Sequence, residues 1–215
     1  MTPLIALVPA RDFRTGKSRL ASVLNEEARD GLGRWMLGRV LEALGGSGAA
    51  AEVAVLSDSP DVLSLAGEHG AAGIRCPARD LNADLEAGRA WALARGAEAL
   101  LVVPADLPTL RAEEVGRLAA RGREEAAGRA GLAVLAPSGD GGTNGLLLRP
   151  GRALPFAFGP GSFARHWREA EARSLRVLRF ESRGFGLDLD TPSDLDALLG
   201  SGASLPEWLA GTPRS

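Results

Sequence analysis

A short segment near the start of the chain carries the residues best suited to hold a polyphosphate. Four cationic side chains stand there within nine residues, beside the single carboxylate of Asp12: Arg11, Arg14, Lys17 and Arg19. Lys17 is also the only lysine among the 25 lysine and arginine residues of the chain. Clustered cations of this kind suit a polyphosphate, although the segment taken alone equally fits a solvated basic loop.

Two common nucleotide-binding motifs do not account for this segment. Gly16-Lys17-Ser18 resembles the end of a Walker A motif, but that motif requires glycine where Arg11 stands. The dinucleotide fingerprint G-x-G-x-x-G also fails, because Met36 occupies the third glycine position after Gly31 and Gly33. The sequence therefore disfavours both a P-loop NTPase and a dinucleotide-binding protein.

Three aspartates offer oxygen ligands for a hard cation. Asp106 follows an apolar run and lies between Pro104 and Pro108, which stiffen the chain on both sides. Asp188 and Asp190 are two residues apart, so both point to the same side if their segment is a strand. Carboxylates that share a face repel each other unless a cation lies between them. The alternatives are that Asp106 is a turn residue and that Asp190 caps the helix after it.

Two glycine-rich turns are candidates for binding an anion. In residues 140–144 (D-G-G-T-N), paired glycines expose backbone N–H groups just before the hydroxyl of Thr143. In residues 158–163 (F-G-P-G-S-F), we expect Ser162 to be the N-cap of a helix, where free N–H donors meet the positive end of the helix dipole. Taken alone, the first turn equally fits an ordinary hairpin and the second a plain helix cap.

The sequence contains no recognisable set of side chains around a nucleophile. His69 and His166 both fall on expected helices and are interpreted as surface or satisfied residues, and Cys76 as a small buried residue. A substrate phosphate needs little help as a nucleophile, because its second pKa of about 6 leaves it ionised near neutral pH. Such chemistry requires positioning and charge neutralisation by metal and cations.

The elements that must position these residues alternate between short apolar runs and longer helical patterns. This alternation is typical of βαβ units around a mostly parallel sheet. We expect strands over residues 4–8, 53–56, 73–76, 99–103, 132–136, 146–149, 175–180 and 185–189. We expect helices after Asn25 and over residues 60–69, 81–95, 111–121, 163–173 and 192–199. Ligands of such sheets bind beyond the carboxyl ends of the strands, which is where the candidate residues fall.

The composition fits one globular domain, expected over residues 1–199, followed by a C-terminal tail over residues 200–215. The single cysteine allows no internal disulfide and indicates a reducing compartment, so we expect a cytoplasmic protein. The net charge of -2 predicts neither a nucleic-acid partner nor an anionic membrane. No apolar run approaches the roughly 18 residues of a membrane span.

The order of these segments resembles the 2-phospho-L-lactate/phosphoenolpyruvate guanylyltransferase family of coenzyme F(420) biosynthesis. The resemblance covers residues 4–199, and its most specific parts are the two glycine-rich turns at 140–144 and 158–163. The basic segment and the D-L-D-T-P sequence at 188–192 are shared more widely among molybdopterin-guanylyltransferase-like enzymes. The fold implied by the resemblance is a single α/β nucleotidyltransferase domain with a mixed, mostly parallel sheet flanked by helices.

The resemblance implies Mg²⁺ as cofactor and assigns a role to each candidate residue. The implied metal ligands are Asp106, Asp188 and Asp190. The implied GTP contacts are Arg11, Lys17 and Arg19 at the phosphates and Asp58 and Asn82 near the nucleoside. The implied contacts to the phosphorylated acid are Thr143, Gly159 and Ser162, and the catalytic candidates are Lys17, Arg19 and Asp106. Arg11 departs from the family pattern, which often has lysine there, so a guanidinium fork replaces a point charge.

The reaction implied by the resemblance transfers GMP from GTP to the phosphate of phosphoenolpyruvate or 2-phospho-L-lactate and releases pyrophosphate. The family also includes members that use a phosphoglycerate, and the motifs do not decide between these acids. A related nucleotidyltransferase for molybdopterin or a sugar phosphate is one alternative, and a non-catalytic nucleotide-binding regulatory module is another. The oligomeric state stays open, with a homodimer among the alternatives.

Overall fold

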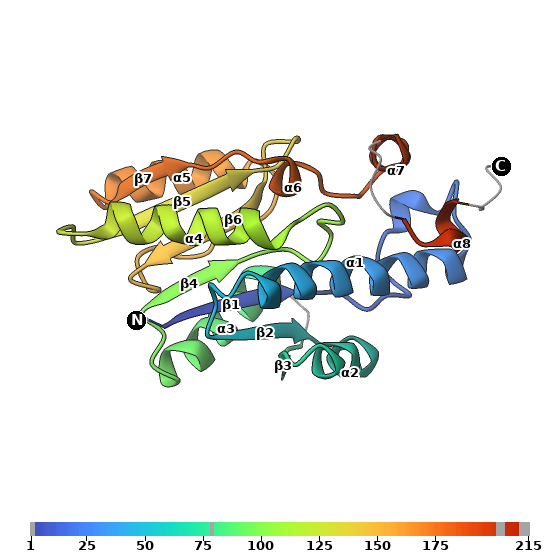
Figure 1. Ribbon diagram of the computed structural model, residues 1–215, viewed down its shortest axis with the longest axis horizontal. Helices are drawn as coiled ribbons and strands as arrows, with labels where there is room; N and C mark the ends of the chain where they lie inside the picture. The colour runs from blue at the N-terminus through green and yellow to red at the C-terminus, as the bar shows by residue number, and fades with distance from the viewer. Residues whose placement is uncertain (1–2, 78–79, 201–204, 211–215) are drawn as a thin grey trace.

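One seven-stranded sheet organises the computed structural model, which describes residues 3–77, 80–200 and 205–210 (Figure 1). The strand order is β3-β2-β1-β4-β6-β5-β7. The strands are β1 Leu4–Pro9, β2 Glu52–Ser57, β3 Ala72–Arg75, β4 Ala99–Val102, β5 Leu132–Pro137, β6 Thr143–Arg149 and β7 Arg176–Arg179. Strand β6 runs antiparallel to β4 and β5, and the other neighbouring pairs are parallel. The prediction of a mixed, mostly parallel sheet is therefore confirmed.

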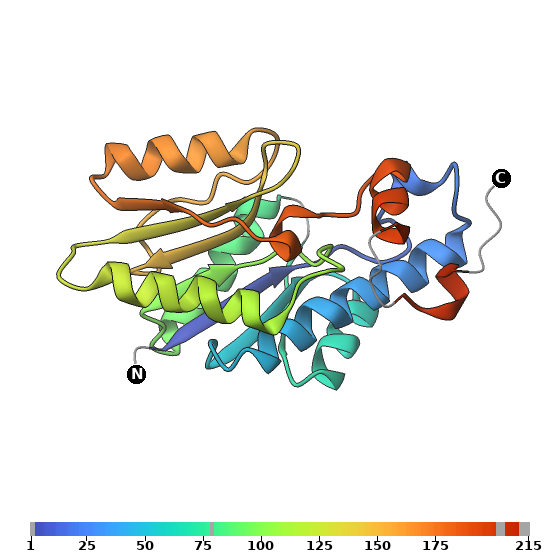
Figure 2. The ribbon, with the colours of Figure 1, turned by 45° about the horizontal axis from the view of Figure 1, so that its top comes forward.

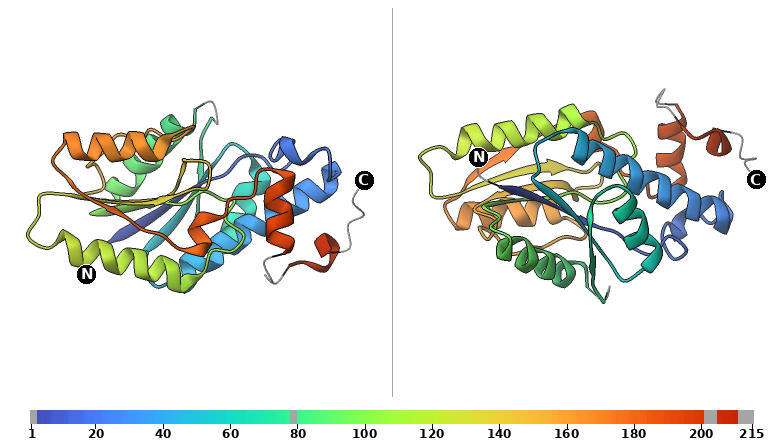
Figure 3. Two further views of the ribbon diagram at one scale, coloured as in Figure 1. Left: turned by 90° about the horizontal axis from the view of Figure 1, so that it is seen from above. Right: turned by 60° about the horizontal axis from the view of Figure 1, so that its bottom comes forward.

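Helices cover both faces of this sheet (Figures 1 and 3). Those whose buried side chains join the cluster on one face are α1 Glu26–Gly46, α2 Pro60–Glu68, α4 Ala112–Ala126 and the short α6 Arg183–Gly186. The opposite face is covered by α3 Leu81–Ala94 and α5 Ser162–Ala172. None of the helices in the described part of the chain combines the length and the apolar character that a membrane span requires.

Strand β1 shows why the central strands are apolar throughout. Its residues Leu4, Ala6 and Val8 join the cluster under α1, whereas Ile5 and Leu7 join the cluster under α3. Because successive side chains of a strand point to opposite faces, a strand covered on both sides needs a continuous apolar run. The sheet therefore separates two cores and fixes the carboxyl ends of its parallel strands at one edge.

The starts of α1 and α7 show how side-chain caps fix expected helices. The Asn25 side chain accepts a hydrogen bond from the N–H of Ala28 at 2.8 Å, which starts α1. Thr191 caps α7 (Pro192–Leu199), and its own N–H donates to the Asp194 carboxylate at 2.7 Å in a capping box. These local signals explain why both helices begin where the sequence predicts.

The expected strand over residues 185–189 is wrong. Ser182 accepts a hydrogen bond from the N–H of Phe185 and caps α6, and residues 187–190 lie outside the sheet. Phe185 is buried and packs edge-on against Phe180, with ring centroids 5.9 Å apart. The argument that Asp188 and Asp190 share a strand face is therefore wrong as well. Their segment still reaches the end of β4, because the N–H of Leu189 donates to the Asp106 carbonyl at 3.1 Å.

The C-terminal elements form an extension beyond the carboxyl ends of the strands (Figure 2). A third apolar cluster combines the start of the chain with its end: Leu20 of the 3-10 helix η1 (Ser18–Leu20), Leu32 and Met36 of α1, Leu195 and Leu198 of α7, and Leu209 of α8 (Glu207–Ala210). The expected tail over residues 200–215 lies partly outside the described residues. Within it, α8 places the Trp208 ring against Gly31 of α1.

Gly184 of α6 packs closely against Glu114 of α4, so Gly184→Ala should destabilise the fold. An added Cβ would overlap the Glu114 carboxylate and lie 2.8 Å from the Cα of Leu110. That carboxylate accepts hydrogen bonds from the N–H groups of Gly184 (2.9 Å) and Arg111 (3.0 Å). Overpacking of this kind should lower the free energy of unfolding by about 1–3 kcal/mol, measured by urea denaturation. Gly186→Ala is the matched control, because no atom lies within 4 Å of its added Cβ. Equal stabilities of the two variants would contradict the prediction.

Candidate active site

Lys17 lies at the centre of the candidate site. Its ammonium donates to Asp106 Oδ2 at 2.7 Å and to Asp190 Oδ1 at 2.6 Å. The side chain is only 12% exposed and starts from a left-handed backbone (φ 54°) just before η1. Burial lowers the pKa of Lys17, but the two carboxylates outweigh burial and raise the pKa above its usual value. The site therefore contains a charged ammonium between two of the expected metal ligands.

Asp188 lies beside this group and is oriented by Asn144. The Asn144 amide donates to Asp188 Oδ1 at 3.1 Å and to the Phe185 carbonyl at 2.9 Å, so it fixes the carboxylate relative to the end of α6. Burial raises the pKa of Asp188, and the nearby charge of Asp106 raises it further. A cation between Asp106 and Asp188 would relieve this repulsion.

Asp106, Asp188 and Asp190 do not form a complete Mg²⁺ site by themselves. Within residues 3–77, 80–200 and 205–210, no three histidine, cysteine or acidic side chains come together as a metal site. Mg²⁺ is, however, usually held by one or two carboxylates together with substrate phosphates and water. Asp106 and Asp188 supply oxygen donors of that kind, and a cation bound there would share Asp106 with Lys17, which pairs with Asp190 as well.

Two further arginines of the basic segment extend toward solvent. The side chains of Arg11 and Arg19 are exposed, whereas Arg14 is paired with Asp61 at 3.5 Å. The pKa of Asp140 is lowered mainly by the Ser138 hydroxyl and the Gly142 N–H, with a smaller contribution from the charge of Arg19. Arg19 therefore faces the glycine-rich turn between β5 and β6.

The structure brings the two glycine-rich turns together through their hydroxyls. Thr143 Oγ1 and Ser162 Oγ lie 3.1 Å apart, and both residues are buried. Ser162 is not the N-cap that the sequence predicts. Gly161, in the left-handed region at φ 67°, takes that position and Ser162 becomes the first helical residue. Two of the N–H groups that were expected to be free already have partners, because Ser162 donates to the Gly159 carbonyl at 3.0 Å and Phe163 donates to the Gly141 carbonyl at 3.3 Å.

The two residues expected near the nucleoside have different environments. The Asn82 amide pairs with the backbone of Phe158, accepting from its N–H at 2.7 Å and donating to its carbonyl at 3.2 Å. Asn82 therefore lies against the turn that contains Gly159, whose φ of 121° requires glycine. Asp58 is exposed just after β2, on the other side of β1 from β4.

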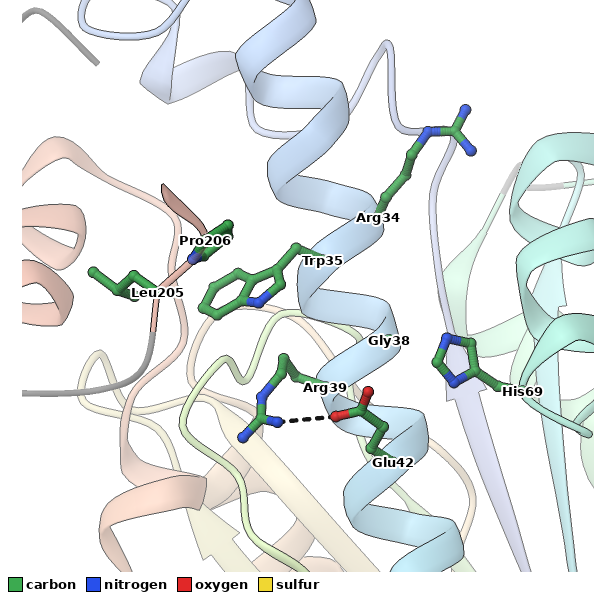
Figure 4. A pocket seen from close by; sticks show the side chains of 8 residues that line it. All are labelled: Arg34, Trp35, Gly38, Arg39, Glu42, His69, Leu205 and Pro206. Carbon is green, nitrogen blue, oxygen red and sulfur yellow. Dashed lines mark hydrogen bonds and ion pairs between the residues drawn. The ribbon is translucent and has the colours of Figure 1, made fainter. Parts of the chain in front are cut away.

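A separate hollow on the outer face of α1 contains none of these residues (Figure 4). Trp35, Leu205 and Pro206 lie on one side of it and His69 on the other, with the ion pair of Arg39 and Glu42 (2.9 Å) between them. Its mixed apolar and paired-charge lining offers no free cations for a triphosphate. The phosphate-binding and metal-binding residues that the sequence predicts lie instead at the sheet edge around Lys17.

Comparison with known proteins identifies the family. The family described as "Guanylyl transferase CofC like" matches residues 4–210. The chain belongs to this family. Among solved structures, a nucleotide-diphospho-sugar transferase of Desulfovibrio desulfuricans G20 matches with a TM-score of 0.78 at 17% identity, covering 97% of this chain and 90% of that one. At that identity the match supports the nucleotidyltransferase fold alone.

Curated relatives of this CofC-like guanylyl transferase differ in the acid named for them. The phosphoenolpyruvate guanylyltransferase of Rubrobacter xylanophilus is 46% identical, covering 93% of this chain and 95% of the relative. The 3-phospho-D-glycerate guanylyltransferase of Phenylobacterium zucineum is 37% identical, covering 88% and 86%. The 2-phospho-L-lactate guanylyltransferase of Methanothermobacter thermautotrophicus is 34% identical, covering 95% and 88%. The chain is thus a guanylyltransferase, as the sequence predicts, rather than a regulatory module.

Sequence reasoning did not predict how two residues contact the candidate site. Asn144 follows Thr143 in the glycine-rich turn, and that motif was the available signal for its contact with Asp188. His166 was interpreted as a surface or satisfied residue, and the second alternative is confirmed, because both ring nitrogens have hydrogen-bond partners. It is fully buried and lies 3.1 Å from Thr143 Oγ1. No local signal distinguishes this histidine from one that is merely buried in a helix.

Proposed function

We propose that this guanylyltransferase transfers GMP from GTP to the phosphate of phosphoenolpyruvate in coenzyme F(420) biosynthesis, with 2-phospho-L-lactate as the second candidate acid. The observation that carries the proposal is the position of two kinds of group at one edge of the sheet. A buried ammonium with carboxylates suits a triphosphate, and the hydroxyl pair of Thr143 and Ser162 suits a small anion. Phosphoenolpyruvate is favoured because it is the acid named for the relative with 46% identity.

In the proposed reaction, an oxygen of the acid's phosphate attacks the α-phosphorus of GTP in line. A new P–O bond forms as the bond between the α-phosphorus and the bridging oxygen breaks, and pyrophosphate leaves with the electron pair. The attacking phosphate is already ionised, so no side chain needs to remove a proton. Lys17 and Arg19 would stabilise charge on the phosphates, and Arg11 would steer the triphosphate to the site.

We further propose Mg²⁺ as the cofactor, held by Asp106 and Asp188 with Asp190 as the third carboxylate. Bound there, Mg²⁺ would neutralise charge on the triphosphate. Support comes from the raised pKa of Asp188, caused by burial and by the neighbouring Asp106. A buried carboxylate whose ionisation is disfavoured by burial and by a neighbouring carboxylate suits a site completed by a cation and substrate phosphates.

The test of the proposed function is pyrophosphate release from GTP with each acid supplied in turn. Phosphoenolpyruvate or 2-phospho-L-lactate should start release, and ATP in place of GTP should support it poorly. Release that depends instead on molybdopterin or a sugar phosphate would assign the chain to the related nucleotidyltransferases. Absence of release with every acceptor would reject the proposal.

Thr143→Ala and Ser162→Ala should each raise the KM for the acid far more than the KM for GTP. Each hydroxyl would donate a charge-assisted hydrogen bond to the acid or support its neighbour in doing so, worth about 1.5–3 kcal/mol, or roughly ten- to hundredfold in KM. Steady-state kinetics with each substrate varied in turn measures the effect. Ser47→Ala is a control, because its hydroxyl donates to the Leu44 carbonyl at the far end of α1. A shift in the KM for GTP alone would place these turns at the nucleotide.

A further inference from the structure

His166 is held in a defined orientation in the interior beneath the two glycine-rich turns. Its ring is fully buried and packs edge-on against Phe158, with ring centroids 4.9 Å apart. Its Nε2 lies 3.0 Å from the backbone nitrogen of Ala157, whose N–H donates to it. Because a backbone N–H can only donate, Nε2 must be the unprotonated nitrogen of the ring.

The remaining ring proton therefore belongs on Nδ1. Burial, with a smaller contribution from the charge of Arg165, lowers the pKa of His166 to about 4, so the ring is neutral near neutral pH. A neutral imidazole carries one proton, and Nε2 is excluded by its hydrogen bond. Among the residues that the structure describes, the partner of Nδ1 is Thr143 Oγ1 at 3.1 Å, so the Nδ1–H donates to this hydroxyl.

The segment that sets this tautomer is itself fixed by side chains. Asn82 pairs with both the N–H and the carbonyl of Phe158, the residue next to Ala157. The Arg165 guanidinium donates to the Ala157 carbonyl at 2.9 Å through Nη2. All four backbone polar groups of residues 157–158 thus have side-chain partners, and the Ala157 N–H has little freedom to turn away from His166.

The tautomer of His166 decides whether the Thr143–Ser162 hydroxyl pair has a hydrogen left to donate. Thr143 and Ser162 lie 3.1 Å apart and own one hydroxyl hydrogen each. One of these hydrogens forms the hydrogen bond between Thr143 Oγ1 and Ser162 Oγ. Because His166 donates to Thr143, no hydrogen is used toward the ring, and one hydroxyl hydrogen remains to donate outward. In the opposite tautomer Thr143 would donate to Nδ1 and Ser162 to Thr143, leaving only lone pairs facing an anion.

We infer that His166 is a positioning residue that makes the Thr143–Ser162 pair a hydrogen-bond donor toward the anionic acid, because the Ala157 N–H holds it in the Nδ1–H tautomer. The identity of the acid rests on the proposed function, whereas the tautomer does not. His166 contacts no substrate in this arrangement. It acts through Thr143, and its loss should affect binding of the acid rather than of GTP.

The first test reads the tautomer directly in the wild-type protein. Long-range proton–nitrogen NMR on isotope-labelled histidine distinguishes protonated from unprotonated ring nitrogens, and the chain has only two histidines. His69→Gln assigns the two signals. At about pH 7 we expect His166 to show a protonated Nδ1 and an unprotonated Nε2. A protonated Nε2, or a mixture of tautomers, would overturn the inference whether or not the enzyme uses phosphoenolpyruvate.

The second test separates the two hydrogen bonds by substitution. Asparagine places an amide N–H near the Nδ1 position, and glutamine places an amide oxygen near the Nε2 position. His166→Gln should therefore raise the KM for phosphoenolpyruvate about tenfold or more, whereas His166→Asn should raise it less, with the KM for GTP little changed in both. Equal effects of the two variants, or a parallel rise in both KM values, would indicate a purely structural role.

His69→Gln is the matched kinetic control, since His69 is the C-cap after α2 and lies beside the hollow on α1, outside the site. Thermal unfolding of all three variants shows whether loss of the fold explains any change. If wild-type protein releases no pyrophosphate with phosphoenolpyruvate, the proposed function fails. The NMR result would then still decide the tautomer, so the two failures are distinguishable.

Discussion

Lys17→Ala is expected to lower kcat by about 10²–10³, the scale of losing one preorganised charge-stabilising contact. The ammonium lies 2.7 Å from Asp106 and 2.6 Å from Asp190, and its raised pKa keeps it charged. In the proposed reaction it stabilises the departing pyrophosphate, where negative charge develops as the P–O bond breaks. Initial rates of pyrophosphate release at saturating GTP and acid measure the loss.

A structural effect of this substitution must be separated from the catalytic one. Removing Lys17 leaves Asp106 and Asp190 without their shared cation, so thermal unfolding should be measured alongside turnover. Lys17→Asn is a useful second variant, because asparagine tolerates the left-handed φ of 54°. Arg14→Ala is the matched control on the same loop, with a side chain 68% exposed and paired with Asp61. Near-normal turnover in both Lys17 variants would remove Lys17 from the mechanism.

Most of the fold could be predicted from local patterns. The seven strands in the described residues overlap expected strands, and the central strand β1 shows why: a strand buried on both faces leaves a continuous apolar signal in the sequence. Helices α1 and α7 begin at the expected residues because Asn25 and Thr191 supply side-chain caps. Such signals depend on neighbours in sequence, which is why they can be recognised without a structure.

The error at residues 185–189 has a physical cause. Phe185, Leu187 and Leu189 alternate with polar or small residues, which is the pattern of a half-buried strand. Their apolar side chains are instead buried by α6 packing on the sheet and by the cluster around α1 and α7. An alternating pattern reports which side chains are buried, but it does not report whether the backbone has a strand partner.

The site was predictable in its location but not in its contacts. Ligands of such sheets bind beyond the carboxyl ends of the strands, so Lys17 and Asp106 were both expected at that edge, where the parallel pairing of β1 and β4 brings them together. The pairing of Lys17 with Asp190 spans 173 residues, and that of Asn82 with Phe158 spans 76. Nothing local encodes partners at that separation. The same holds for His166, whose role depends on a backbone N–H in another segment.

Asp188→Asn should remove most turnover, by about 10²-fold or more, while leaving the fold intact. The substitution keeps an oxygen that can accept from the Asn144 amide, which now donates to Asp188 Oδ1 at 3.1 Å, so the shape of the site is retained and only the charge is lost. Stability should not fall, because burial and the charge of Asp106 already disfavour the ionised carboxyl and raise its pKa.

If Asp188 helps to hold Mg²⁺, the Asp188→Asn variant should also need more Mg²⁺ for half-maximal release of pyrophosphate. Asp61→Asn is the control, since it removes an exposed carboxylate paired with Arg14 and Arg34. Near-normal release by Asp188→Asn at saturating Mg²⁺ would show that this carboxylate does not bind the metal.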